Sequence, residues 1–182
     1  MIVYKIILQN FNSPSAGAER AGELKRRLMS AIISKSDQSK KKKLIDSLAN
    51  YSFFSSFTTE EISLLLFCSE RVKYDKGAEI FKEGDIGTQF YAILKGHVKI
   101  RKEASGRFLA QLGPGEVFGE MAVLDNQPRS ATAEAATAVE LFAFDGHRLL
   151  NDFPHLSVKL LRYLARELSK RLRQADMLLD RF

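Results

Sequence analysis

The sequence predicts an α+β protein with an antiparallel β-sandwich or barrel at its centre and helices at both ends. Short runs of β-branched and aromatic residues recur between residues 72 and 144, and Gly-containing breaks separate them. A spacing of roughly ten residues, without long intervening helices, is typical of antiparallel sandwiches and barrels. Apolar residues at the three-to-four-residue spacing of helices occur before and after these runs.

Composition excludes several classes of protein. The 182 residues are 45% hydrophobic and 27% charged, a balance that disordered chains do not have. The apolar runs fall far short of the roughly 18 residues that a membrane span needs. Cys68 is the single cysteine, so the chain has neither an internal disulfide nor a cysteine metal cluster. We therefore expect a cytoplasmic protein without a membrane span.

Residues 1–47 are predicted to form an N-terminal helical extension with a basic linker. Apolar residues at helical spacing indicate a helix over 19–33, and the polar stretch 34–43 follows it. This stretch includes the lysine run 40–43, which we interpret as a solvated linker; the alternative is a surface for an anionic partner. The net charge of +6 comes from the two ends of the chain, because the central hundred residues are slightly acidic.

Residues 48–154 are predicted to form the central β unit. Thr58 and Glu61 before the apolar residues 62–67 predict a helix start, because the hydroxyl accepts free N–H groups and the carboxylate favours the helix N-terminus. The strands are predicted over seven segments: 72–74, 80–81, 90–94, 98–102, 108–112, 131–134 and 139–144.

Residues 155–182 are predicted to form one long C-terminal helix. Its apolar residues alternate at spacings of four and three, the pattern of a coiled-coil seam: Leu161, Ala165, Leu168, Leu172, Ala175, Leu179 and Phe182. We expect this seam to form a parallel homodimer. The alternative is that the stripe packs on the chain's own barrel.

Residues 113–133 depart from the strand pattern. The segment 119–124 has the length of one helical turn, whose first N–H groups lack partners and can bind an anion. Arg129 and Ser130 add a guanidinium fork and a hydroxyl, so the set predicts a phosphate site. Glu120 would repel a phosphate but can accept from a sugar hydroxyl, and the site therefore suits a ribose phosphate. The alternative is that Glu120 only caps a helix and Arg129 only pairs with it.

The residues 118–123, Phe-Gly-Glu-Met-Ala-Val, and 129–135, Arg-Ser-Ala-Thr-Ala-Glu-Ala, strongly resemble the phosphate-binding cassette of the cyclic nucleotide-binding domain family. The segments 80–87 and 90–96 resemble the family's first glycine signature, with Ala92 where a larger apolar residue is usual. The resemblance runs from about Leu48 to the C-terminus. It implies an antiparallel β-roll, a jelly-roll-like double-stranded β-helix, with a helical lid.

The resemblance also implies roles for individual residues. Gly119, Met121 and Ala122 would present backbone N–H groups to the phosphate, and Glu120 would accept from the ribose 2′-hydroxyl. Further implied contacts are Arg129 and Ser130, with Ala131, at the phosphate, and Ile100, Leu109 and Ala110 at the base, where barrel core is an equally good explanation. Ser130 favours cyclic AMP over cyclic GMP, because threonine at this place accompanies cyclic GMP in the family.

We expect a non-catalytic regulatory domain that senses a cyclic nucleotide and repositions its C-terminal helix for an unknown effector protein. The residues contain no nucleophile–base set, and His97, His147 and His155 are not at metal-ligand spacing, so neither catalysis, a metal nor a further cofactor is expected. We also expect no direct DNA-binding domain. The alternative function is a scaffold or dimerisation module that keeps the fold without binding nucleotide.

Overall fold

The computed structural model describes residues 35–179. The predicted helix over 19–33 lies outside this range, and so does Phe182. The elements are α3 (Lys35–Leu48), η1 (Phe54–Ser56), α4 (Thr59–Phe67), β1 (Ser69–Tyr74), β2 (Glu79–Phe81), β3 (Gln89–Lys95), β4 (Val98–Arg101), β5 (Phe108–Leu112), β6 (Val117–Phe118), α5 (Met121–Asp125), β7 (Thr132–Ala135), β8 (Val139–Asp145), α6 (Gly146–Asp152) and α7 (Pro154–Leu179).

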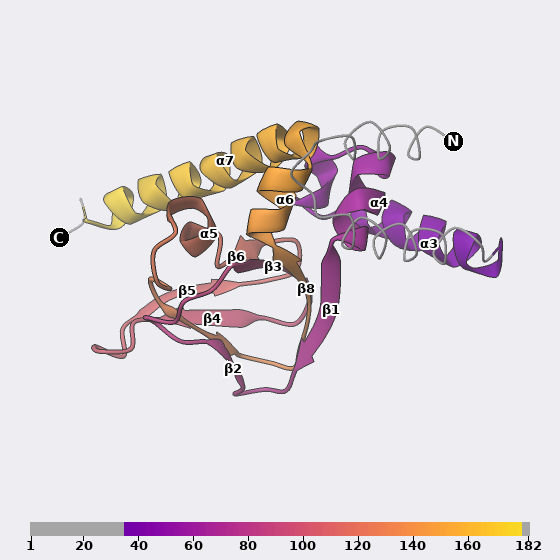
Figure 1. Ribbon diagram of the computed structural model, residues 1–182. Helices are drawn as coiled ribbons and strands as arrows, with labels where there is room; N and C mark the ends of the chain where they lie inside the picture. The colour runs from indigo at the N-terminus through magenta and orange to yellow at the C-terminus, as the bar shows by residue number, and fades with distance from the viewer. Residues whose placement is uncertain (1–34, 180–182) are drawn as a thin grey trace.

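The strands form two four-stranded antiparallel sheets, which confirms the predicted α+β class and β-roll. One sheet has the order β1-β8-β3-β6 and the other the order β2-β7-β4-β5. Helices lie against the first sheet at both ends of the chain, and α7 runs along the molecule above α5 (Figure 1). Except for the paired strands β4 and β5, consecutive strands of the chain lie in different sheets. The β2–β3 connection lies beside the segment before β7, where Gly84 N–H donates to the Arg129 carbonyl.

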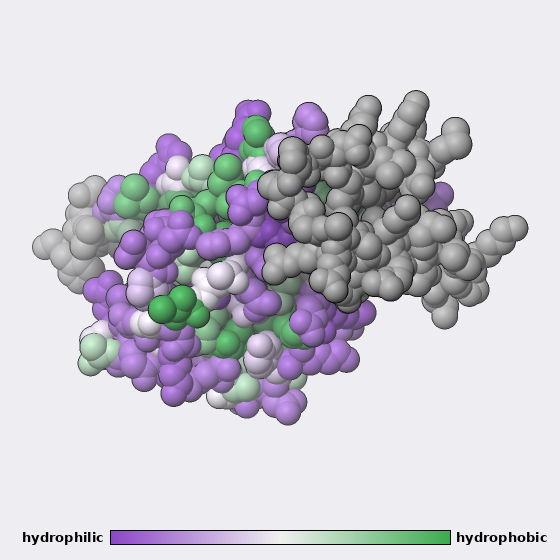
Figure 2. Space-filling view, viewed as in Figure 1, coloured by the Kyte–Doolittle hydropathy of each residue, from purple (hydrophilic) through white to green (hydrophobic). Residues whose placement is uncertain are grey.

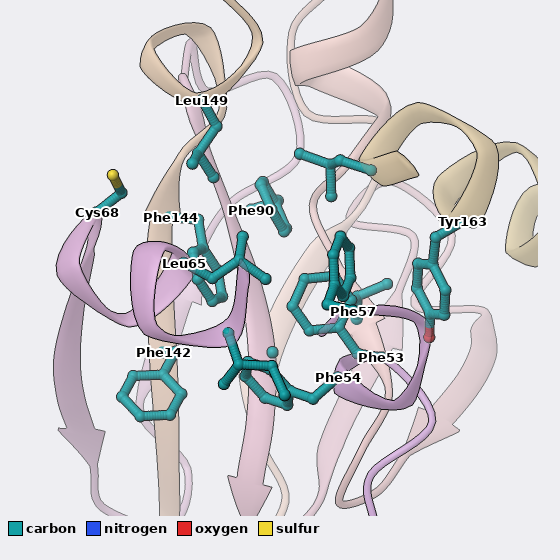
Figure 3. Packing of buried hydrophobic residues seen from close by; sticks show 14 of the residues in the cluster. Phe53, Phe54, Phe57, Leu65, Cys68, Phe90, Phe142, Phe144, Leu149 and Tyr163 are labelled. Atoms are coloured by element: carbon teal, nitrogen blue, oxygen red, sulfur yellow. The ribbon is translucent and has the colours of Figure 1, made fainter. Parts of the chain in front are cut away.

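The two central strands of the first sheet, β3 and β8, are buried on both faces, because their side chains alternate between two hydrophobic clusters. Tyr91 and Leu141 lie in the cluster between the two sheets. Phe90 and Phe144 point the other way, into the cluster that α3, α4, α6 and α7 cover. Phe53 lies in the middle of this second cluster (Figure 3). This cluster joins the first sheet to the helices.

The N-terminal half of the described chain confirms one prediction and corrects another. Thr58 caps α4 with a complete capping box, in which its hydroxyl accepts from Glu61 N–H and the Glu61 carboxylate accepts from Thr58 N–H. The lysine run 40–43 is not a linker but part of α3. Lysine, serine, aspartate and glutamine are compatible with a helix, and Ile45 and Leu48 anchor its last turns in the core.

The C-terminal half contains two elements that the sequence did not predict. The two-residue strand β6 is too short to show any periodicity. The helix α6 precedes the predicted C-terminal helix, and Asp145 caps it by accepting from Arg148 N–H. Pro154 opens α7 at a position where its missing N–H costs nothing, which separates the two helices.

Most of the predicted coiled-coil stripe lies on the exposed face of α7. Leu161, Ala165, Leu172 and Ala175 are exposed, Leu172 to 64%, whereas Leu168 is partly buried. A different set faces the core, namely Leu156, Leu160, Tyr163 and Leu164. Figure 2 shows hydrophobic residues on the surface over α7. The alternative that the stripe packs on the chain's own barrel is therefore wrong for its exposed members.

Candidate ribose-phosphate site

Arg129 lies in the connection between α5 and β7 and is buried, with 5% of its surface exposed. Its Nη1 donates to the Gly119 carbonyl at 2.6 Å, and its Nη2 donates to the Gln89 carbonyl at 2.7 Å. Its backbone is also held, because Arg129 N–H donates to the Asp85 carbonyl and its own carbonyl accepts from Gly84 N–H. The guanidinium is therefore fixed from the cassette side and from the start of β3.

The guanidinium is also packed on its faces. Its carbon lies 4.1 Å from the centroid of the Phe81 ring, the distance of a cation–π contact. A Cβ at Gly87 would come within 2.7 Å of Nη2, so only a glycine leaves room for the guanidinium at this position. Burial lowers the pKa of Arg129, while the nearby Tyr91, Asp85 and Glu120 act in the opposite direction. Arginine nevertheless keeps its charge in proteins.

Two of the five guanidinium N–H groups bind carbonyls, which leaves three. Among the described residues Arg129 Nε has no hydrogen-bond partner, although it is buried. A buried donor without a partner costs about 1–3 kcal/mol, and more when it is charged. The side chain is therefore held in place with unused donors, as an anion-binding group requires.

Glu120 is 1% exposed and pairs with a residue of α7. Arg171 Nη1 donates to Glu120 Oε1 at 2.7 Å, and Arg171 Nη2 donates to the Val117 carbonyl. Burial raises the pKa of Glu120, and the Arg171 charge opposes that rise. Glu120 makes no side-chain cap bond to α5, and Arg129 donates to carbonyls. The alternative that Glu120 only caps and Arg129 only pairs with it is therefore wrong.

The remaining cassette residues lie around the start of α5. The first bond of this helical turn runs from Val123 N–H to the Glu120 carbonyl, so the amides of Met121 and Ala122 precede it and have no partner within the helix. Gly119 has a φ of +78°, and a Cβ there would lie 2.8 Å from Arg129 Nη1. Ser130 is exposed, and its hydroxyl contacts the Met121 sulfur at 3.6 Å. Ala131 is buried.

The structure separates the three predicted base residues. Ile100 of β4 and Ala110 of β5 are register partners and pack against the cluster between the sheets. Leu109 lies at the irregularity of the β4–β5 pairing and is exposed. Core packing therefore accounts for Ile100 and Ala110, whereas Leu109 is free to contact a ligand.

A pocket of about 330 Å³ adjoins the guanidinium. It is lined by Phe81, Asp85, Ile86, Gly87, Thr88, Gln89, Tyr91 and Arg129. Arg129 is the one predicted site residue in this lining. The cassette and the pocket thus meet at the guanidinium.

The chain is similar in sequence and in fold to known proteins. The family of the cyclic nucleotide-binding domain matches residues 71–152. The cyclic AMP receptor protein of Thermus thermophilus is 40% identical over 133 residues, which cover 70% of this chain and 60% of that protein. Residues 71–152 belong to the cyclic nucleotide-binding domain family.

Two other proteins are similar to this cyclic nucleotide-binding domain. A CRP-like cAMP-activated global transcriptional regulator of Mycobacterium tuberculosis is 34% identical over 129 residues, 68% of this chain and 58% of that protein. The N-terminal domain of a transcriptional regulator from Streptomyces coelicolor A3(2) has a TM-score of 0.57 and 34% identity, and the match covers 70% of this chain and 94% of that one. These names are those of regulators, in agreement with a non-catalytic domain.

The chain spans about three fifths of the length of the curated relatives that it matches first. One of them is a transcriptional regulator by name. The expectation that the protein has no direct DNA-binding domain therefore does not fit these relatives. No helix among residues 35–179 is long and apolar enough to cross a membrane.

Two residues of the site, Arg171 and Phe81, could not be assigned to it from the sequence. Arg171 is one of several basic residues on the predicted C-terminal helix, and nothing in its spacing points to Glu120. Phe81 lies in the segment that resembles the first glycine signature, and nothing in that segment points to Arg129. Both contacts join segments far apart in the chain, so no local pattern could have found them.

Proposed function

We propose that this domain senses a cyclic nucleotide, and that its ligand is cyclic AMP. The observation that carries the proposal is Arg129, a buried guanidinium that two carbonyls hold in place and that keeps a partnerless Nε–H. A cyclic phosphate supplies the charge and the acceptor oxygens for these free donors. Similarity to a cyclic AMP receptor protein supports the choice of ligand.

The surrounding residues complete the recognition of a ribose phosphate. The amides of Met121 and Ala122 and the hydroxyl of Ser130 would donate to the phosphate, with Gly119 and Ala131 keeping the backbone close to it. Glu120 would accept from the ribose 2′-hydroxyl, and Leu109 would contact the base. No other cofactor is required, and a cytoplasmic location stays a prediction.

A thermal-shift screen with cyclic AMP, cyclic GMP and cyclic CMP tests the proposal. A ligand that binds only the folded state stabilises it by RT ln(1 + [L]/Kd), about 2.7 kcal/mol at a hundredfold excess over Kd. We expect cyclic AMP to raise the melting temperature the most. Unchanged melting temperatures with all three nucleotides would favour the alternative, a scaffold or dimerisation module that does not bind nucleotide.

The Glu120–Arg171 ion pair offers a route from the site to α7. A ribose hydroxyl that donates to Glu120 changes the environment of the carboxylate to which Arg171 of α7 is bonded. Binding would then shift α7 between two positions, which is the proposed signal to the unknown effector protein.

Replacement of Arg171 by methionine is expected to lower the free energy of unfolding by about 2 kcal/mol, because it leaves the buried Glu120 carboxylate without its cation. Urea denaturation at neutral pH measures the loss. Adding Glu120→Gln should recover most of it, since a neutral amide needs no counter-charge. Wild-type stability of the single variant would show that the ion pair does not hold α7.

The exposed stripe of α7 supports a second part of the proposal, a parallel homodimer. Leu161 and Leu172 are too exposed to contribute to the chain's own core, and their spacing suits a coiled coil. We expect sedimentation equilibrium to give twice the monomer mass, and Leu172→Asp to give a monomer. A wild-type monomer at high micromolar concentration would contradict the homodimer.

A further inference from the structure

A closed polar network contacts the backbone of Ser130. Lys102 Nζ donates to the Ser130 carbonyl at 2.7 Å and to Glu83 Oε1 at 2.8 Å. Glu83 Oε2 accepts from Glu103 N–H at 2.7 Å. Thr132 Oγ1 donates to Glu103 Oε2 at 2.8 Å and accepts from Glu83 N–H at 2.9 Å. The network joins the β2–β3 connection, the end of β4 and the start of β7.

The same β2–β3 connection holds the residue before Ser130. Arg129 N–H donates to the Asp85 carbonyl at 2.8 Å, and Gly84 N–H donates to the Arg129 carbonyl at 2.9 Å. The backbone of both proposed phosphate residues is therefore fixed from one segment, directly at Arg129 and through Glu83 and Lys102 at Ser130.

Lys102 is the member of the network whose positive charge could act on the proposed phosphate. Its ammonium group is bonded to the carbonyl of the residue whose hydroxyl is proposed to bind the phosphate, so it lies within one residue of that site. Its side chain is 42% exposed, and its counter-charge Glu83 is shared with the Glu103 amide. These two bonds lower the pKa of Glu83, which keeps the ion pair formed at neutral pH.

We propose that Lys102 is a positioning residue for the phosphate. It orients Ser130 through the carbonyl bond and adds positive potential beside the site. This role rests on the proposed function. The role requires a positively charged hydrogen-bond donor at position 102, which lysine and arginine supply. Methionine has a similar length but neither a charge nor a donor, so Lys102→Met removes the role while keeping the size of the side chain.

Calorimetric titration of Lys102→Met with cyclic AMP, at low and at high salt, tests the role. We expect about a fivefold weaker affinity at low salt, as for other partly exposed charge-assisted bonds, and a smaller difference at high salt because salt screens the added potential. Lys102→Arg should bind like the wild type. Lys73→Met is the matched control, because Lys73 is also a lysine beside a glutamate, Glu140, but on the other sheet.

A measurement without nucleotide separates this role from the proposed function. Lys102→Met should accelerate amide hydrogen exchange over residues 129–132, whereas Lys73→Met should not. Unchanged exchange overturns the positioning role, whether or not the wild type binds cyclic AMP. If Lys102→Met binds cyclic AMP within twofold of the wild-type affinity at both salt concentrations, the positioning role is also overturned. The same holds if Lys102→Met loses affinity equally at both salt concentrations and Lys102→Arg does not restore it. A wild type that fails to bind contradicts the proposed function instead.

Discussion

Arg129→Ala is expected to weaken cyclic AMP binding by about 100-fold or more, which corresponds to about 3 kcal/mol at 1.4 kcal/mol per decade. The guanidinium is buried and its unused N–H groups are the strongest donors of the site. Without them the phosphate would be desolvated and left without its counter-charge, which is the costly case for a buried ion. Isothermal titration calorimetry of the variant measures the loss.

Two variants serve as controls for this prediction. Arg162→Ala removes an exposed arginine of α7 and should leave the affinity unchanged. Arg129→Lys keeps the charge but cannot donate from a planar fork to both Gly119 and Gln89, so an intermediate affinity is expected. A near-wild-type titration curve for Arg129→Ala would refute the assignment of Arg129 to the phosphate.

Phe53→Ala is expected to lower the free energy of unfolding by about 3–5 kcal/mol, the usual range for a fully buried phenylalanine. The Phe53 ring is inaccessible to solvent. It makes edge contacts, at centroid distances between 4.9 and 6.1 Å, with five rings: Phe54, Phe57, Phe90, Phe144 and Tyr163. These rings come from η1 and the residue that follows it, from the first sheet and from α7, so Phe53 links α7 to the sheet.

Equilibrium denaturation with urea measures the effect of Phe53→Ala. Phe108→Ala is the matched control, because Phe108 is 55% exposed and its loss should change the free energy of unfolding by less than about 0.5 kcal/mol. Phe53→Leu keeps an apolar side chain and should fold if the alanine variant does not. A cost below about 1 kcal/mol for Phe53→Ala would show that the cluster can collapse around the lost ring.

The sequence predicted the elements whose signals are local. The Thr58 cap, the seven strands and the long C-terminal helix follow from capping chemistry and from the spacing of apolar residues. The elements that it missed have weak local signals. β6 has only two residues. α6 has seven residues, and its N-cap Asp145 is also the last residue of strand β8. The lysine run has the charge of a linker but also an adequate helix propensity, and in the structure it is part of α3.

The residues of the site were predictable because one contiguous cassette contains most of them. Gly119, Glu120 and Arg129 do come together in space, where Arg129 donates to the Gly119 carbonyl. The partners from other elements were not predictable from local patterns. Arg171 reaches the site through the packing of α7, and Lys102, which follows β4, reaches it through its bond to the Ser130 carbonyl. Among the proposed base residues, Leu109 is exposed because the β4–β5 pairing is irregular there, which no pattern of residues reveals.

The Nε–H resonance of Arg129 reports most directly on the proposed contact, and Arg129→Lys identifies it in a ¹⁵N-labelled sample by removing it. Saturation with cyclic AMP should shift this resonance strongly, because a phosphate brings charge and acceptor oxygens to the guanidinium. Adenosine, which has the same base and no phosphate, should leave it in place. Complete binding of cyclic AMP with an unmoved Arg129 resonance would mean that the nucleotide is held elsewhere on the molecule.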